Sequence, residues 1–343
     1  MKKKEKHSTI KSGLLRFARR ILKKIATPFI LFLHRNVRYK NLLESKRRKQ
    51  LTIFETQELS IPLPYAPHHV CHGMNYYGFF YSFTNYAGIK KINPRYGIEH
   101  GLYLAAKGKK YSSEITFSDY REQMLWKSGS KAIKIGPYIH YAEPFLDNSV
   151  FTRLKQELGK VLLVFPTHSL DSFQATYDMQ AFIDSIELHR TAYTTVMVCL
   201  HWKDFEWKRN LEYEKHGYKI VTAGHPYDTY FLSRLKCIIN LSDMVIGNDI
   251  GTFLGYCIYL NKPVFLFSQP IYLNPNQSEK AFYKEINLRN REEWNELKQT
   301  KESFFSLFSK FEEKITDEQY NTISHLFGFE YVRDKETLRR LLR

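Results

Sequence analysis

The stretches KIVTAGHP (residues 219–226) and MVIGNDIGT (residues 244–252) each follow a short apolar run with a turn, after which the spacing of apolar residues becomes helical. This order predicts two consecutive strand–turn–helix units of a parallel sheet. In such sheets, ligands bind at the carboxyl ends of the strands, and the helix N-termini there favour anions. The two turns are therefore predicted to hold one phosphorylated ligand between them.

The same alternation continues through the second half of the chain. Apolar runs predict strands at residues 161–165, 195–200, 219–223, 244–246 and 263–267, and helical patterns fill the gaps at residues 173–188, 205–216, 229–242 and 251–260. The strand runs lack a strict alternation of apolar and polar residues, as expected when both faces of a sheet are covered. We therefore expect a parallel sheet with helices on both faces.

The first half of the chain contains a shorter set of α/β elements. Strands are predicted at residues 115–117 and 131–135, and helices at residues 76–86 and 120–126. The resulting fold class is α/β, with two Rossmann-like domains facing a cleft. We place a basic arm at residues 1–50, the first domain at 51–150, the second at 151–278 and a charged helical segment at 279–343.

The net charge of +17 belongs almost entirely to the N-terminal arm. Residues 1–50 contain 17 lysines and arginines but only two acidic residues, so the rest of the chain carries a charge of only +2. A nucleic-acid-binding domain has basic residues distributed over a face of its folded body. We therefore do not expect nucleic acid as a partner.

The arm has the pattern of an amphipathic helix that lies on a membrane surface. Apolar residues recur at helical spacing from Leu14 to Phe29, and arginines and lysines fill the positions between them. Such a helix binds anionic lipid headgroups, although a basic helix packed on the body remains an alternative. The apolar stretch at residues 25–33 is shorter than the roughly 20 residues that span a bilayer. We expect residues 1–33 to hold a cytoplasmic protein on the inner face of the cell membrane, without a signal peptide.

The cysteines and one histidine cluster give no zinc pattern. His68, His69 and His72 lie around Cys71 but lack a partner pair at standard zinc spacing. This cluster is predicted to be a loop with polar contacts to a substrate, namely the acceptor of a transferred group. All four cysteines occur singly and predict reduced thiols: Cys71, Cys199, Cys237 and Cys257.

Two turns of the second half carry the predicted phosphate-binding residues. A glycine at position 251 lets backbone amides approach a phosphate, and the Thr252 hydroxyl can donate a hydrogen bond. Asn248 lies in the same loop. His225 and Pro226 occupy the preceding turn, where the alternative is a rigid turn with proline at the first helical position.

A third turn, FPTHS (residues 165–169), ends the first strand of the same half and places His168 and Ser169 at the same edge of the sheet. Both are assigned to the predicted site for the phosphorylated ligand, which we expect to be a nucleotide-linked donor. His168 could instead cap a helix or donate a hydrogen bond to a core carbonyl. Asp249 could orient a sugar hydroxyl or cap the helix that begins near Gly251.

The first half supplies a candidate catalytic base in GIEHG (residues 97–101). Transfer to a hydroxyl requires a group that removes its proton as it attacks, and histidine or a carboxylate can do so near neutral pH. His100 is our first candidate and Glu99 our second. The alternative is a glycine-rich turn with a solvated histidine.

These motifs resemble, over residues 95–268, bacterial GT-B glycosyltransferases of surface polysaccharide synthesis: the sialyl- and Kdo-transferases and the CDP-glycerol glycerophosphotransferases. His225-Pro226 resembles their His-Pro pair at the donor phosphate, and Gly251-Thr252 stands where they carry a phosphate loop. Glu99-His100-Gly101 is similar to the His-Gly motif that bears their base. The chain departs from them in lacking a Ser-Ser or Ser-Thr pair in the loop and an acidic motif of the sialyltransferase kind.

The resemblance implies an inverting glycosyltransferase that needs neither a metal nor a cofactor. Its donor would be a nucleotide-sugar, with CMP-linked Kdo or sialic acid favoured, and its acceptor a glycan or lipid-linked glycan of lipopolysaccharide or capsule synthesis. One alternative is a CDP-polyol phosphotransferase of the same fold. Another is a non-catalytic α/β module that its basic arm tethers to a membrane or nucleic acid.

Overall fold

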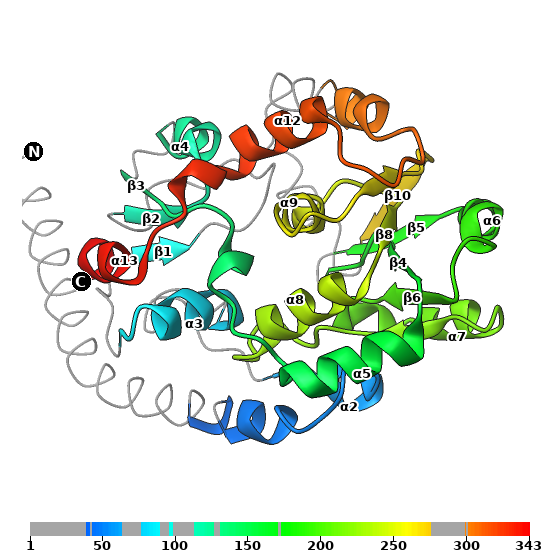
Figure 1. Cartoon of the computed structure of the whole chain (residues 1–343), viewed down its shortest axis with the longest axis horizontal. Helices are drawn as coiled ribbons and strands as arrows, with labels where there is room; N and C mark the ends of the chain where they lie inside the picture. Colours follow the sequence, from blue (N-terminus) through cyan, green and yellow to red (C-terminus); the bar gives the residue numbers. More distant parts are fainter. Residues whose placement is uncertain are drawn as a thin grey trace, which may run out of the picture.

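The protein, described here from a computed structural model, is an α/β molecule with two parallel sheets (Figure 1). The described residues are 39–41, 43–63, 77–89, 96–98, 113–126, 131–170, 173–275, 299 and 301–343. The predicted membrane helix, the histidines around Cys71, and the pair Glu99 and His100 lie outside these residues. Within them, no helix is long and apolar enough to cross a membrane.

The larger sheet has five parallel strands in the order β7-β6-β4-β8-β9. Their bounds are β4 Val161–Phe165, β6 Thr195–Cys199, β7 Lys219–Val221, β8 Met244–Gly247 and β9 Val264–Leu266. The chain starts in the centre at β4 and moves outward through β6 to β7. It then returns to the other side of β4 to form β8 and β9. The predicted parallel sheet is confirmed, and its winding direction reverses between β4 and β8 in the manner of a Rossmann-like sheet.

Alternate side chains of the central strand point to two separate hydrophobic clusters. Val161, Leu163 and Phe165 pack with α5 (Asn148–Leu158), α8 (Phe231–Leu241) and α9 (Thr252–Tyr259). Leu162 and Val164 pack on the other face with α6 (Met179–Arg190) and with α7 (Arg209–Glu214). Because successive residues of a strand point to opposite faces, a sheet covered on both sides needs apolar residues at every position.

One predicted helix was wrong at its start. Residues 173–177 form a strand, β5 (Phe173–Tyr177), that pairs antiparallel with β10 (Ile271–Pro275). In this segment only Ala175 is buried, so a half-buried strand is favoured over a helix with an apolar stripe. The helix α6 begins after Asp178, whose carboxylate accepts the N–H of Ala181 at 2.9 Å.

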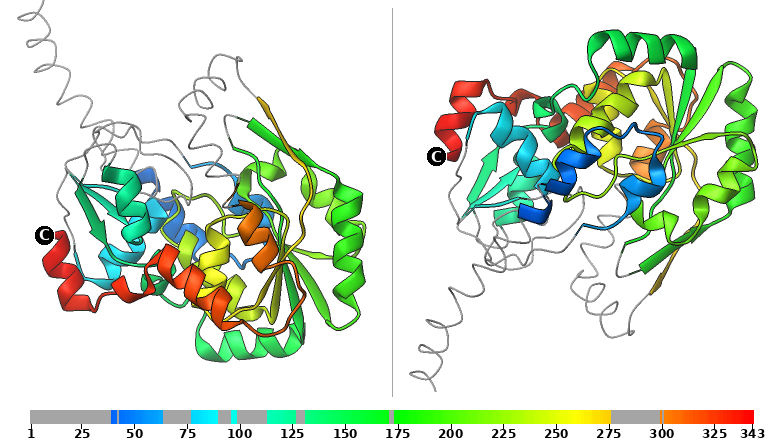
Figure 2. Two further views of the ribbon diagram at one scale, coloured as in Figure 1. Left: turned by 90° about the horizontal axis from the view of Figure 1, so that it is seen from above. Right: turned by 90° about the horizontal axis from the view of Figure 1, so that it is seen from below.

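The smaller sheet has the order β1-β2-β3, again parallel. Its strands are β1 Tyr96–Ile98, β2 Ser113–Thr116 and β3 Lys131–Lys134, and its neighbouring helices are α3 Tyr77–Tyr86, α4 Asp119–Trp126 and the 3-10 turn η2 Tyr138–Tyr141. The helices and strands predicted for this half are thus confirmed. Figure 2 shows that the two sheets lie apart, with α8 and α9 between them.

The two halves are packed on each other through a single hydrophobic cluster. The ring of Phe79 on α3 lies 5.2 Å from that of Phe231 on α8. The backbone N–H of Gly78 donates to the carbonyl of Pro226 at 2.9 Å. A Cβ atom at Gly78 would lie 2.4 Å from the carbonyl oxygen of Asp228, so only glycine allows α3 to approach this loop so closely.

The C-terminal segment returns to the first half and ties it to the second. It consists of a helix at residues 301–307, α12 (Asp317–Phe327), η4 (Phe329–Tyr331) and α13 (Lys335–Leu342). The Ser118 hydroxyl donates to the carbonyl of Leu326 at 2.6 Å, and the Arg339 guanidinium donates to the carbonyl of Ala87 at 2.8 Å. The helical prediction for this segment is confirmed for these described parts.

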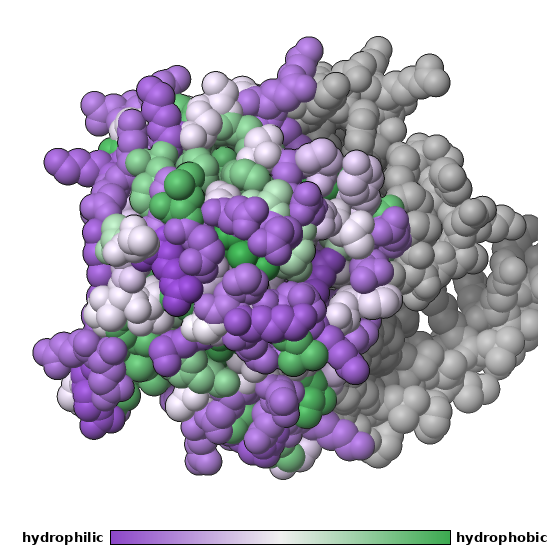
Figure 3. Space-filling view, turned by 90° about the vertical axis from the view of Figure 1, so that its right-hand side faces the viewer, coloured by the Kyte–Doolittle hydropathy of each residue, from purple (hydrophilic) through white to green (hydrophobic). Residues whose placement is uncertain are grey.

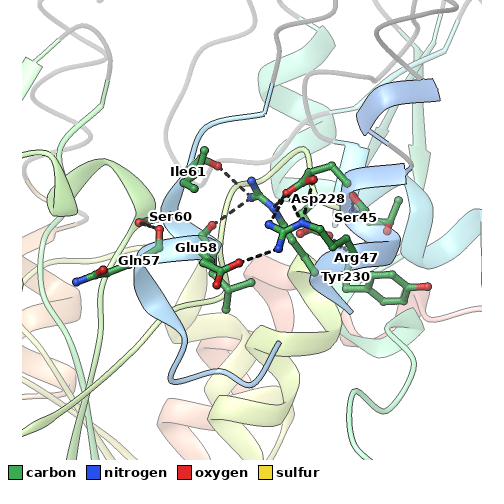
Figure 4. Close-up of polar contacts among 12 residues, drawn as sticks. Ser45, Arg47, Gln57, Glu58, Ser60, Ile61, Asp228 and Tyr230 are labelled. Carbon is green, nitrogen blue, oxygen red and sulfur yellow. Dashed lines mark hydrogen bonds and ion pairs between the residues drawn. The ribbon is translucent and has the colours of Figure 1, made fainter. Parts of the chain in front are cut away.

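The end of the predicted basic arm belongs to the folded body. Residues 39–41 and 43–48 are helical, and Asn41, Ser45 and Arg48 are buried. The Ser45 hydroxyl accepts the N–H of Thr229 at 3.2 Å. Arg47 pairs with Glu58 of α2 (Thr56–Ser60), as Figure 4 shows. The helix at residues 43–48 therefore belongs to the folded body and contacts the second half through Ser45.

The loop that receives these contacts is fixed by a fully buried ion pair. Arg234 and Asp228 both have 0% exposed side chains and are 2.8 Å apart. Arg234 also donates to the carbonyl of Ala223 at 3.0 Å, and Asp228 accepts the N–H of Tyr230 at 3.0 Å. Residues 223–230 therefore form a rigid joint between the two halves.

The molecular surface over α6, the face turned to the viewer in Figure 3, is covered mainly by hydrophilic side chains, with small hydrophobic groups between them.

Cys199, Cys237 and Cys257 are free and buried, and burial raises the pKa of each thiol. These three cysteines therefore behave as unreactive core residues.

We expect Asp228→Ala to lower the free energy of unfolding by about 3–5 kcal/mol, because it leaves the buried Arg234 charge without its carboxylate counter-ion. Urea denaturation followed by tryptophan fluorescence measures this change. The control is Glu157→Ala, which removes an exposed pair with Arg153 at 3.8 Å and should cost less than about 1 kcal/mol. Equal effects of the two variants would contradict the assigned role of the joint.

Candidate functional site

The carboxyl ends of β4 and β8 meet where the winding of the larger sheet reverses. Phe165 at the end of β4 pairs with Gly247 at the end of β8, so the turns at residues 166–169 and 248–251 are adjacent. The helices that come next, α6 and α9, cover opposite faces of the sheet. This switch point is the general position of ligand sites in open α/β sheets.

Asn248 joins the two turns. Its side-chain Oδ1 accepts the backbone N–H of Thr167 at 2.7 Å, and the residue is fully buried. The other end of the amide, Nδ2, and the Thr167 hydroxyl are both buried without a hydrogen-bond partner in the described part of the chain. A buried polar group without a partner costs about 1–3 kcal/mol, so two of them in adjacent turns point to a ligand that supplies the missing bonds.

The first turn of α9 offers further hydrogen-bond donors at the same place. Gly251 precedes the helix in an extended conformation, and no side chain caps the helix start at Thr252. The first N–H groups of a helix lack partners within the helix, and the helix dipole adds partial positive charge there. Together with Asn248 Nδ2 and the Thr167 hydroxyl, this turn makes the switch point suitable for an anion.

Aromatic packing brings α9 close to the strand ends. The ring of Phe253 stacks on that of Phe165, with centroids 4.8 Å apart and an interplanar angle of 23°. A Cβ atom at Gly247 would lie 2.5 Å from the Phe253 ring, so glycine is required there. The start of α9 is therefore held beside the end of β4.

Asp249, the acidic residue of this turn, is already neutralised. Its Oδ1 accepts the N–H of Ile250 and pairs with the Lys301 ammonium group, both at 2.8 Å. It does not cap α9, since that helix has no side-chain cap. The paired carboxylate adds little net repulsion toward an anion at the switch point.

A buried ion pair stabilises the turn after β4 through hydrogen bonds to its backbone. Arg209 pairs with Asp204 at 3.0 Å and donates to the carbonyl of Thr167 at 3.1 Å. Asp204 also accepts the N–H of Ser169 at 3.1 Å, and burial raises the pKa of Asp204. Ser169 is itself buried, with its hydroxyl accepting the N–H of Ala175 of β5 at 3.3 Å. The structure therefore gives Ser169 a supporting position beneath the turn.

His168 differs from its neighbours because its side chain is exposed. Its ring lies 4.5 Å from that of His201, which follows β6, with an interplanar angle of 37°. Protein groups still surround the imidazole closely enough that desolvation lowers its pKa, while Asp204 and Asp249 act in the opposite direction. His168 thus lies at the switch point with its ring accessible.

His225 lies elsewhere on the same edge and caps a turn. It is buried, its ring is 4.6 Å from that of Trp202, and its Nδ1 accepts the N–H of Tyr227 at 3.1 Å. Pro226 follows in the joint between the halves, where its carbonyl accepts the N–H of Gly78. The contacts of both residues are those of a structural turn.

The sheet order does not bring the His225 and Gly251 turns together. β6 and β4 separate β7 from β8, so the ends of the two strands are about 14 Å apart at the usual strand spacing. One phosphate cannot contact both turns. The two consecutive units are not neighbours in the sheet, because the chain crosses to the other side of β4 before it forms β8. The structure pairs residues 248–251 with residues 166–169 instead.

Three residues of this site were missed in the sequence: Thr167, Asp204 and Arg209. Thr167 stands beside His168 in a turn that was already singled out, so its position was visible although its free hydroxyl was not. Asp204 and Arg209 lie in or beside a segment predicted as one helix, and nothing in the sequence marks them as partners. Among the described residues, no three His, Cys, Asp or Glu side chains are grouped to hold a metal ion.

No family model and no curated protein sequence matches the chain. The solved structures similar to it include the wall teichoic acid polymerase TagF (12% identity, TM-score 0.40), Anabaena Alr3699/HepE in complex with UDP-glucose (12%, 0.31) and the UDP-GlcNAc 2-epimerase from Neisseria meningitidis bound to UDP-GlcNAc (11%, 0.35). The matches cover 72%, 67% and 71% of this chain. They cover 65%, 62% and 71% of the three other chains, so this chain spans less than two thirds of the first two. At these scores the likeness assigns no activity to this chain.

We expect Thr167→Val to leave the free energy of unfolding unchanged or to raise it by up to about 1 kcal/mol, because it removes a buried hydroxyl that has no partner among the described residues. The control is Thr222→Val. Its hydroxyl donates to the carbonyl of Leu200 at 2.8 Å and accepts the N–H of Gly224 at 3.1 Å, so its loss should cost about 1–3 kcal/mol. Urea denaturation compares the variants. A Thr167→Val protein as unstable as Thr222→Val would show that the Thr167 hydroxyl is bonded.

Proposed function

We propose that this protein is a transferase that uses a nucleotide-linked donor and binds the donor phosphate at the switch point between β4 and β8. The observation that carries the proposal is the gathering, in two adjacent turns, of donors that have no partner within the described part of the chain: the Thr167 hydroxyl, Asn248 Nδ2 and the uncapped start of α9 at Thr252. Phosphate oxygens accept hydrogen bonds from each of these groups.

The same donors suit the chemistry of transfer. When the bond between the anomeric carbon and the phosphate oxygen breaks, negative charge develops on the leaving phosphate. Fixed amide, hydroxyl and helix N-terminal donors stabilise such charge because they are already oriented toward it. The buried pair of Arg209 and Asp204 holds Thr167 in place and so keeps this arrangement rigid.

The base is proposed from the first half of the chain. β1 ends at Ile98, so Glu99 and His100 follow directly on the carboxyl end of a strand in the second parallel sheet. In the proposed two-domain arrangement, His100 removes the proton of the acceptor hydroxyl as its oxygen attacks the anomeric carbon. The carbon–oxygen bond to the phosphate breaks on the opposite side, which inverts the configuration at that carbon.

The donor and acceptor follow from the family resemblance. CMP-linked Kdo or sialic acid is the first donor to test, and a CDP-polyol is the second, because the resemblance extends to glycerophosphotransferases. The acceptor would be a glycan of lipopolysaccharide or capsule, carried on lipid. Residues 1–33 would keep the protein at the anionic membrane surface where such acceptors lie.

We expect the full-length protein to bind at least one of CMP, CDP and UDP, measured by calorimetry. Asn248→Asp should weaken this binding at least about tenfold, or about 1.4 kcal/mol, because a carboxylate keeps the acceptor for Thr167 but removes the N–H donor and repels phosphate. The control is Asn261→Asp, which makes the same charge change at an exposed turn. The proposal fails if none of the three nucleotides binds.

We expect His100→Ala to keep nucleotide binding and to lower transfer about 10²–10⁴-fold, as loss of a general base does. A radiolabelled nucleotide-sugar and a lipid-linked glycan acceptor measure the transfer. His325→Ala, at an exposed position of α12, is the control and should transfer at the normal rate. Transfer by His100→Ala at the normal rate would exclude His100 as the base. Nucleotide binding without turnover by the unaltered protein would favour the non-catalytic module.

A further inference from the structure

The ring nitrogens of His168 are not hydrogen-bonded to any residue that the structure describes. His168 follows Thr167 directly at the end of β4, its side chain is exposed, and neither ring nitrogen has a hydrogen-bond partner in the described part of the chain. The ring packs beside His201 at 4.5 Å. An accessible imidazole beside an unbonded hydroxyl is well placed to contact the ligand of the switch point.

The other two histidines on this edge, His201 and His225, each accept a backbone hydrogen bond that stabilises a turn. Nδ1 of His225 accepts the N–H of Tyr227 at 3.1 Å, and Nδ1 of His201 accepts the N–H of Lys203 at 3.4 Å. An imidazolium has N–H groups at both nitrogens and accepts no hydrogen bond. Protonation of either ring would therefore break a turn, so only His168 can take up a proton without such a loss.

The charged groups around His168 are already paired with each other. Asp204 on η3 (Trp202–Phe205) is bound to Arg209 of α7, and Asp249 in the turn before α9 is bound to Lys301. Asp204, Asp249 and Arg209 are the charged residues that act on His168, and the ring of His201 packs beside it. Neither carboxylate is free to serve as the counter-ion of an imidazolium. Desolvation therefore prevails, and the pKa of His168 lies below that of an ordinary histidine.

We propose that a phosphate-bearing ligand binds at the switch point together with a proton, which His168 takes up so that its imidazolium donates a hydrogen bond to the phosphate. The proposal rests on the proposed function and adds the identity of a group that titrates on binding. The phosphate supplies the negative counter-charge for the imidazolium, because Asp204 and Asp249 are already paired with Arg209 and Lys301. An opposite charge within hydrogen-bond distance raises the pKa of a histidine, so the bound state holds the proton that the free state lacks.

The sign of the pH dependence follows from this difference. The bound pKa of His168 is higher than the free one, so binding takes up a proton between these two values. Affinity should rise as the pH falls through this window, by at most about tenfold per pH unit, and should level off below the pKa of the free protein. Above the bound pKa, the imidazole is neutral in both states and affinity should be independent of its titration.

The test is calorimetry on the full-length protein at pH 7 in two buffers with different ionisation enthalpies. A nucleotide-sugar is the probe, because its phosphates are esterified and do not titrate near neutral pH. The unaltered protein should take up a fraction of a proton, at most about one, per ligand bound. His168→Gln keeps a neutral hydrogen-bond donor, so it should bind without this uptake and with a flat pH profile. The control His325→Gln, at an exposed position of α12, should behave like the unaltered protein.

The outcomes separate this inference from the proposed function. Nucleotide binding without proton uptake, or uptake that persists in His168→Gln, overturns the inference and leaves the donor site intact. If no nucleotide binds, the experiment is repeated with inorganic pyrophosphate, whose own titration is cancelled by comparing His168→Gln with the unaltered protein. Proton uptake on pyrophosphate binding that depends on His168 then supports the inference, even though the proposed function has failed. If there is no such uptake, the inference and the proposed function are both overturned. If His168→Gln does not fold, His168→Asn and the imidazole NMR signals of the unaltered protein during ligand titration report the same proton.

Discussion

The structure depends on the reversal of winding between β4 and β8. Because α6 and α9 cover opposite faces of the sheet, the carboxyl ends of β4 and β8 meet between them and neither helix covers these strand ends. The backbone N–H of Thr167 would lack a partner there, and the side chain of Asn248 provides one at 2.7 Å. One end of this amide thus completes the fold, while its other end has no hydrogen-bond partner among the described residues.

Two buried ion pairs hold two turns on the same edge of the sheet, but the turns differ in function. Arg234 and Asp228 fix the turn after β7, which serves as the joint with α3 and with residues 39–50. Arg209 and Asp204 fix the turn after β4. The first turn is filled by protein contacts, whereas the second has a Thr167 hydroxyl without a partner among the described residues and an accessible histidine. Local rigidity is common to both turns, and in our proposal the second one binds a phosphate.

The alternation of strands and helices was predictable from residues such as Val161–Phe165 and Thr195–Cys199, because uninterrupted apolar runs identify strands covered on both faces. The half-buried strand β5 was not, since its single buried residue, Ala175, gives no periodic signal. The site was predictable in part. Asn248, Gly251, Thr252 and His168 stand in turns that the sequence marks, whereas the support from Asp204 and Arg209 comes from residues whose pairing has no local pattern.

The sequence by itself determined which segments are strands, which turns follow them, and that the basic charge lies in the N-terminal arm. Only the tertiary structure decided which turns are neighbours. In a parallel sheet every inner strand has the same apolar character, and its hydrogen bonds come from the backbone, so side chains carry little information about which strand lies beside which. The order is set by how the connecting helices pack on the two faces. That packing places β8 against β4 and separates the turn at His225 from the turn at Gly251.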